Sequence, residues 1–143
     1  NGIIQGFCDF VGSGGTFAGC AAAFKEYDSN IQCFVVEPKG AAVLAGKAVT
    51  NAGHRIQGGG YSKADLRFLD TEYMDGFLDI SDKQAIETAR KLAEQEGIFA
   101  GFSSGANVAA AIELLKGPLK GKVVATMIND SGLKYLSTDL WAS

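Results

Sequence analysis

The stretch VGSGGTF, residues 11–17, constrains the fold of this chain more than any other part of its sequence. It follows an apolar run at residues 3–11 and precedes FAGCAAAFKEY, a composition that favours a helix. A strand, a glycine-rich turn and a helix in this order are typical of an anion site, because the first N–H groups of the helix have no partner within it. Ser13 and Thr16 would add hydroxyl donors. The alternative is that the glycines only make a tight turn.

The rest of the chain alternates between strand and helix patterns. Three further short apolar runs predict buried strands: residues 31–37, 77–80 and 122–128. Three segments predict helices: residues 41–49, the segment from the capping box at Ser81 to Glu96, and residues 103–116. Residues 50–70 are expected to be mostly loop, and residues 98–102 are ambiguous. The alternation predicts a single α/β domain over residues 1–143, with an open, mostly parallel sheet and helices on both faces.

Composition excludes several classes of function. The chain has 143 residues and a formal net charge of −3, which leaves no basic surface for nucleic acid or for an anionic membrane. No apolar stretch reaches the length of about 20 residues that a membrane helix needs. Cys8, Cys20 and Cys33 lack CxxC spacing, so we expect small buried side chains, no metal site and a reducing, cytoplasmic setting.

Two known phosphate-binding patterns fit the first loop poorly. A nucleotide P-loop needs a lysine directly after the glycines, where this chain has Thr16 and Phe17. A dinucleotide fingerprint could use Gly12, Gly14 and an acid at Glu37, but its third glycine would fall at Phe17. The dinucleotide interpretation is therefore the weaker one.

A second glycine-rich segment, GFSSGAN at 101–107, also places hydroxyls at the start of a predicted helix. In an open parallel sheet this segment and the first loop would both face the carboxyl edge, where ligands bind. The alternative is that Ser103 or Ser104 simply caps the helix.

Segments spread over nearly the whole chain resemble the C-terminal part of the cysteine synthase (O-acetylserine sulfhydrylase) family, which has the pyridoxal-phosphate fold type II. GSGGT at 12–16 resembles the family's phosphate loop, usually GTGGT, and VEP follows at 36–38. HRIQGGG at 54–60 resembles HKIQGIG, GFSSGAN at 101–107 resembles GISSGA, and DSGLKYLST at 130–138 resembles DSGERYLST. The resemblance implies the cofactor-binding portion of that fold, with the N-terminal portion absent.

The resemblance also implies the cofactor, pyridoxal 5′-phosphate, and the residues that would hold it. Its phosphate would lie in the loop formed by Gly12, Ser13, Gly14, Gly15 and Thr16. Ser103 would hydrogen-bond the pyridine nitrogen. Five further residues are expected to line the pocket: Gly58, Gly59, Ser104, Asp130 and Ser131. His54, the one histidine, is expected in a structural or rim role, and Glu37 in a structural role at a strand end.

A serine at the pyridine nitrogen implies a particular chemistry. A hydroxyl leaves that nitrogen largely neutral, and the resulting weak electron sink suits β-elimination. The resemblance therefore implies a transferase that makes L-cysteine from O-acetylserine and sulfide. Alternatives are a cystathionine β-synthase-like enzyme and a non-catalytic remnant that binds a phosphate ligand or a partner, with a nicotinamide enzyme more remote.

The family's Schiff-base lysine belongs to an SxKDR-like segment that these 143 residues do not contain. No catalytic residue is therefore assigned, and we expect this chain to act as part of a longer enzyme and to be inactive alone. The segment GGGYSKADL departs from the family's GIGAGF, which bears on the expected amino-acid substrate. The resemblance further implies a homodimer and docking of a serine acetyltransferase tail.

Overall fold

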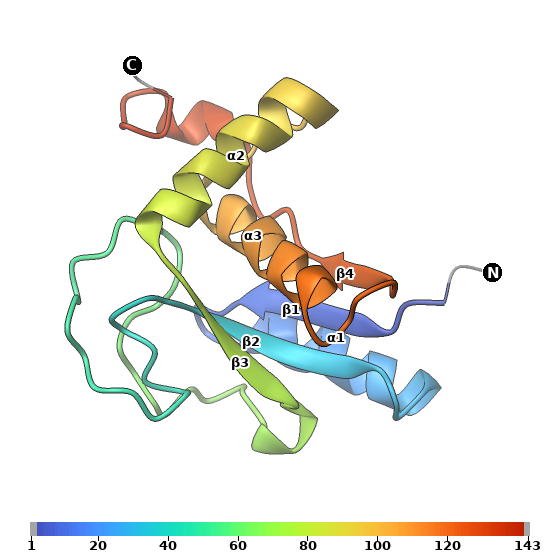
Figure 1. The fold of residues 1–143 in the computed structure, drawn as a ribbon. Helices are drawn as coiled ribbons and strands as arrows, with labels where there is room; N and C mark the ends of the chain where they lie inside the picture. Colours follow the sequence, from blue (N-terminus) through green and yellow to red (C-terminus); the bar gives the residue numbers. More distant parts are fainter. Residues whose placement is uncertain (1–2, 142–143) are drawn as a thin grey trace.

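Four parallel strands form a single sheet in the computed structural model, which describes residues 3–141 (Figure 1). The strands are β1 (Gly6–Phe10), β2 (Gln32–Pro38), β3 (Gly76–Ile80) and β4 (Val124–Thr126), and their order in the sheet is β3-β2-β1-β4. All three neighbouring pairs are parallel, with Cys8 opposite both Phe34 and Thr126. The predicted open parallel α/β sheet is therefore confirmed.

The strand order explains why helices cover both faces. The chain moves outward from β1 to β3, with α1 (Gly15–Tyr27) between β1 and β2, and then returns to the far side of β1 through α2 (Asp82–Glu96) and α3 (Phe102–Lys116). Because parallel crossovers are right-handed, reversing the direction of travel puts α1 on one face and α2 and α3 on the other. Figure 1 shows this arrangement. Two 3-10 turns, η1 (Thr71–Tyr73) and η2 (Gly132–Tyr135), complete the elements.

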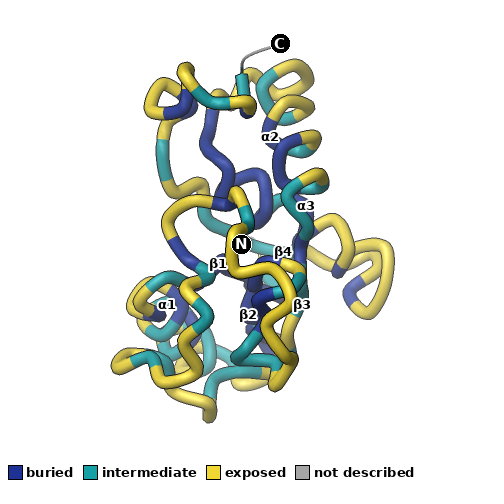
Figure 2. The backbone as a smooth tube through the Cα atoms, turned by 90° about the vertical axis from the view of Figure 1, so that its left-hand side faces the viewer, coloured by how far each residue is buried: buried dark blue, intermediate teal, exposed yellow. Residues whose placement is uncertain are grey.

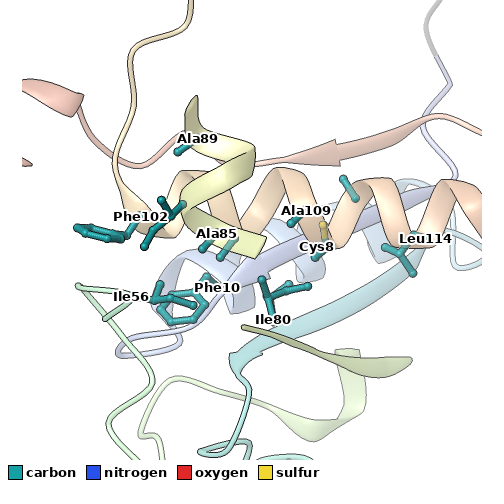
Figure 3. Packing of buried hydrophobic residues seen from close by; sticks show 14 of the residues in the cluster. Cys8, Phe10, Ile56, Ile80, Ala85, Ala89, Phe102, Ala109 and Leu114 are labelled. Carbon is teal, nitrogen blue, oxygen red and sulfur yellow. The ribbon is translucent and has the colours of Figure 1, made fainter. Parts of the chain in front are cut away.

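Each face of the sheet has its own hydrophobic core. On the α1 side, Phe7 of β1 packs with Phe17 and other buried side chains. On the opposite side, Cys8 and Phe10 of β1 pack with α2 and α3 (Figure 3). The alternation of side chains along β1 thus contributes to both cores, and all five of its residues are buried. Figure 2 shows dark, buried backbone toward the middle of the molecule and yellow, exposed backbone along the outer loops. Neither Cys8 nor Cys33 is exposed, as predicted, whereas Cys20 is half-buried.

Helices α2 and α3 pack closely because a glycine lies between them. A Cβ atom on Gly105 of α3 would lie 2.1 Å from the carbonyl oxygen of Ala85 and 2.9 Å from the Cβ of Ala89. The predicted capping box of α2 is present, since Ser81 Oγ accepts from Gln84 N and Gln84 Oε1 accepts from Ser81 N. The helix ends at Gly97 in the left-handed conformation. None of the helices between residues 3 and 141 combines the length and apolar composition that a bilayer crossing needs.

Two sequence predictions differ from the structure. Residues 41–49, predicted as a helix, form turns, because the carboxylate of Glu37 accepts the N–H groups of Leu44 and Ala45 and Gly46 has a φ of 73°. The last strand, predicted over 122–128, is limited to residues 124–126, because the side chain of Asn107 takes the hydrogen bonds of Phe10 N and Met127 O beyond it. The ambiguous segment 98–102 holds a single antiparallel bridge, from Ala100 to Ser131, and the first residue of α3.

The packing of Gly105 predicts opposite effects for two glycine-to-alanine changes. Gly105→Ala is expected to lower the free energy of unfolding by about 1–3 kcal/mol, since overpacking outweighs the gain of about 1 kcal/mol that alanine brings to a helix. Gly19→Ala in α1, where an added Cβ meets nothing within 4 Å, is expected to raise it by about 0.5–1 kcal/mol. Urea denaturation of both variants measures these changes. If the free energy of unfolding changed in the same direction in both variants, the prediction would be contradicted.

Candidate functional site

A polar pocket of about 150 Å³ opens at the carboxyl ends of β1 and β4. These strands flank the point where the strand order reverses, which is where open α/β sheets bind ligands. The pocket is lined by residues 9–17, which include the whole predicted phosphate loop, and by Gly58 and Asn129. The fold therefore brings the first loop, the HRIQGGG segment and the chain after β4 to one place.

The N-terminus of α1 supplies the donors of this pocket. The first backbone hydrogen bond of the helix runs from Ala18 N to Gly14 O, so the N–H groups of Gly15, Thr16 and Phe17 make no backbone hydrogen bond within residues 3–141. Gly15 N has one long contact, 3.4 Å, with Ser13 Oγ. The first turn carries no acidic side chain and no side-chain cap. Such an uncapped N-terminus presents N–H groups and the positive end of the helix dipole to an anion.

Glycines are required where the first loop meets the segment 58–60. A Cβ atom on Gly12 would lie 2.6 Å from Gly58 O, and one on Gly59 would lie 2.4 Å from Val11 O. Gly60 N donates to Val11 O at 3.1 Å, which joins the two segments directly. The GGG of the HRIQGGG motif therefore shapes the pocket through its backbone.

His54 and Glu37 both hold loops in place. His54 Nε2 lies 2.8 Å from Gly60 O, a carbonyl that can only accept, so Nε2 carries the hydrogen in this contact. Glu37 is 2% exposed, and its two carboxylate oxygens accept from Leu44 N and Ala45 N at 2.9 and 3.0 Å. Both residues thus act on the backbone of their own loops, which agrees with the structural roles expected from the sequence.

Asn107 separates β1 from the chain after β4. The β1–β4 ladder ends at the pair Cys8 and Thr126. Beyond it, Asn107 Oδ1 accepts from Phe10 N at 2.6 Å, and Asn107 Nδ2 donates to Met127 O at 3.0 Å. The amide of α3 thus occupies the place of a direct strand-to-strand hydrogen bond. This insertion ends β4 early and keeps the pocket open between the two strands.

The same amide holds a buried carboxyl in the pocket wall. Asp9 is 2% exposed, and its Oδ1 accepts from Asn107 Nδ2 at 3.1 Å. Nδ2 also lies 3.1 Å from Asn129 Oδ1, so its two hydrogens are shared among three acceptors. Burial raises the pKa of Asp9 to about 6, although the hydrogen bond from Asn107 opposes the shift.

The other predicted site residues lie around the start of α3. Ser103 and Ser104 are buried in its first turn and do not cap it, because the N-cap is Gly101. Ser104 Oγ accepts from Asn129 N at 2.9 Å, which links it to the pocket, whereas Ser103 is not among the lining residues. Asp130 accepts from the hydroxyl of Tyr135.

Two backbone hydrogen bonds join the chain at Asp130 and Ser131 to the segment that leads into α3. Gly101 N donates to Asp130 O at 3.2 Å, and Gly132 N donates to Phe99 O at 3.0 Å. The GFSSGAN and DSGLKYLST motifs are therefore adjacent in the fold. Gly59 lies with His54 in the wall of a neighbouring pocket.

Asp9, Asn107 and Asn129 were not among the residues selected from the sequence. Asp9 interrupts an otherwise apolar strand directly before the glycine-rich loop, and Asn107 interrupts an alanine-rich helix. A polar residue within an apolar pattern is the signal that could have identified both, because buried polar groups require partners.

Asp9→Asn is expected to change how stability depends on pH. The pKa of Asp9 in the folded state, about 6, exceeds its ordinary value of 3.8. The folded state therefore keeps a proton that the unfolded state has lost, and stability falls as the pH rises from about 4 to 6. Asparagine cannot ionise. The free energy of unfolding of the variant, relative to the parent, should rise by about 2 kcal/mol between pH 4.5 and 7.

Urea denaturation at the two pH values measures this difference. The control is Asp28→Asn, which removes the same charge at the C-cap of α1, at the other end of the helix from the pocket. A parent-to-variant difference for Asp9→Asn that stays the same at both pH values would show that Asp9 is ionised in the folded state throughout.

Comparison with known proteins gives a consistent result. A family model described as pyridoxal-phosphate dependent enzyme matches residues 2–130. A probable cysteine synthase of Bacillus subtilis is 42% identical over 97% of this chain and 44% of its own length. The chain spans about 44% of the length of such curated relatives.

Solved structures agree in fold. O-acetyl serine sulfhydrylase isoform 3 from Entamoeba histolytica has a TM-score of 0.89 and 32% identity, over 96% of this chain and 41% of that one. An O-acetylserine dependent cystathionine beta-synthase from Helicobacter pylori has a TM-score of 0.85 and 36% identity, over 97% of this chain and 44% of that one. With a family model that covers most of its length, this chain belongs to the pyridoxal-phosphate dependent enzyme family.

Proposed function

We propose that this chain is the cofactor-phosphate-binding part of an enzyme that makes L-cysteine from O-acetylserine and sulfide. The observation that carries the proposal is the uncapped N-terminus of α1, which opens into a polar pocket at the reversal of strand order. Family membership supplies the ligand, since the family depends on pyridoxal phosphate. The relatives named above support the reaction.

The described residues fit the phosphate of this cofactor. Gly15, Thr16 and Phe17 offer backbone N–H groups, and Ser13 and Thr16 line the pocket with hydroxyls. The contact of Gly12 with Gly58, where even a methyl group would clash, keeps the wall narrow and free of side chains. When bound, the cofactor supplies an electron-withdrawing ring that stabilises negative charge developing on the substrate.

We assign the other side of the cofactor site to the start of α3. Ser103, in its first turn, would accept or donate a hydrogen bond at the pyridine nitrogen, one helical turn before Asn107. Ser104, through its hydrogen bond from Asn129 N, would fix the pocket wall. The bridge from Ala100 to Ser131 holds this turn against the segment that contains Asp130.

Turnover in this account requires polypeptide beyond these 143 residues. The lysine-bearing segment of the family has no counterpart in the sequence, and the relatives are more than twice as long. Homodimer formation, the acetyltransferase tail and a cytoplasmic location belong to the same proposal for the whole protein.

A cystathionine β-synthase-like reaction is the second candidate. The likeness to the Helicobacter pylori enzyme, at 36% identity, favours it. The two reactions differ in the thiol that replaces acetate, so the longer enzyme assayed with sulfide and with homocysteine separates them. A preference for homocysteine over sulfide would contradict L-cysteine as the product.

Binding of pyridoxal phosphate to this chain is the test of the proposed site. We expect saturable binding by absorbance, and no stoichiometric lysine adduct by intact mass after borohydride reduction. Gly12→Ala should weaken binding about tenfold or more, equivalent to about 1.4 kcal/mol, because its methyl group displaces Gly58. Gly19→Ala, with nothing within 4 Å, is the matched control and should bind as the parent does.

Two comparisons show which part of the cofactor each group of residues contacts. Pyridoxal, which lacks the phosphate, should bind far more weakly than pyridoxal phosphate, and Ser103→Ala should weaken both through the ring. Equal binding of the two ligands, or equal binding by Gly12→Ala and the parent, would contradict the phosphate cradle.

A further inference from the structure

The pocket at the N-terminus of α1 contains a carboxyl group where an anion is expected. Asp9 lines it together with the phosphate loop, residues 12–16, which we call the cradle. The lining within residues 3–141 includes no lysine, arginine or histidine. A bound phosphate would therefore be held by N–H dipoles and hydroxyls without a cation. In a cavity of about 150 Å³, an ionised Asp9 would repel that phosphate.

Asp9 cannot easily turn away from the pocket. Its side chain is buried, and Oδ1 is held by Asn107 Nδ2 at 3.1 Å. Asn107 is itself 0% exposed and fixed by its contacts with Phe10 N and Met127 O. The carboxyl is thus a fixed part of the pocket wall, and its Oδ1 already has a partner in Asn107.

We propose that Asp9 makes anion binding at this cradle depend on protonation: the neutral carboxyl donates a hydrogen bond from Oδ2 to an oxygen of the anion, and the ionised carboxyl opposes binding. The proposal rests on the proposed function, because it takes the cradle as the phosphate site. It adds a specificity rule, namely that the cradle binds an anion together with a proton.

The surroundings favour the neutral form. Burial raises the pKa of Asp9 to about 6 even without an anion nearby. The titratable groups that feel its charge are the thiols of Cys8 on β1 and Cys20 on α1, and burial raises the pKa of both. The packed elements α3 and the chain after β4 present amides, from Asn107 and Asn129.

Two further titratable side chains near the pocket are directed elsewhere. Asp130 accepts from the Tyr135 hydroxyl, and the His54 ring contacts Gly60 O. None of the described residues that line the pocket is a cation that could offset the carboxyl charge.

Linkage gives the direction and size of the effect. A bound anion stabilises the proton on Asp9, so by reciprocity the proton stabilises the bound anion. If binding raises the pKa by one unit, the dissociation constant at pH 8 is about tenfold larger than at pH 5.5. A larger shift makes the difference larger.

Sulfate is the probe of choice, because it stays a dianion over this pH range. We would follow the backbone amide signals of Gly15, Thr16 and Phe17 by NMR while titrating sulfate at pH 5.5 and pH 8. The parent and the charge-matched control Asp28→Asn should bind about tenfold more weakly at pH 8. Asp9→Asn should bind equally at both values, because its amide keeps a donor and cannot ionise.

The outcomes separate the two proposals. Sulfate binding that does not depend on pH in the parent, or an equal pH dependence in Asp9→Asn, would overturn the role of Asp9 and leave the cradle in place. If sulfate shifts none of these amides at either pH, the phosphate cradle itself is wrong.

A measurement of proton uptake on sulfate binding tests the proposal with the parent protein alone. Calorimetry of sulfate binding by the parent, in buffers of different ionisation enthalpy, counts the protons taken up. We expect uptake between about pH 6 and 7, and none at pH 5 where Asp9 is already protonated. Zero uptake throughout would contradict the proposal.

Discussion

The rest of the site depends on one buried amide, that of Asn107. At the carboxyl edge of the sheet, β1 and the chain after β4 would continue to pair if nothing lay between them, and their ladder would close the crevice. Asn107 prevents this while satisfying both strands, since it accepts from Phe10 N and donates to Met127 O. An amide suits this place because it offers a donor and an acceptor together. An apolar side chain would leave both backbone groups buried without partners.

The glycines of the sequence motifs have different physical roles. Gly12, Gly58 and Gly59 allow two backbone segments to approach closely beside the pocket. Gly105, in the middle of GFSSGAN, instead allows α2 and α3 to pack together and does not contact the pocket. One motif therefore serves both the core and the site. Ser104 faces the chain that follows β4, and its neighbour Gly105 faces α2.

Local patterns predicted most of the fold, and long-range contacts account for what they missed. The capping box at Ser81 and the glycine-rich loop were predictable because their partners lie within a few residues. The helix predicted at 41–49 was wrong because Glu37, outside the segment, takes two of its N–H groups. The roles of Asp9 and Asn107 depend on each other across 98 residues, a pairing that no local pattern contains.

The family's motifs predicted which segments gather at the carboxyl edge, and the structure brings them together there. They did not predict that Asp9 lines the pocket, because the phosphate-loop motif begins at Gly12, after Asp9. A crystal structure of this chain grown with pyridoxal phosphate tests the central claim most directly. The account predicts the phosphate against the N–H groups of Gly15, Thr16 and Phe17, in the crevice that Asn107 holds open. Cofactor bound elsewhere, with this crevice free of phosphate, would contradict it.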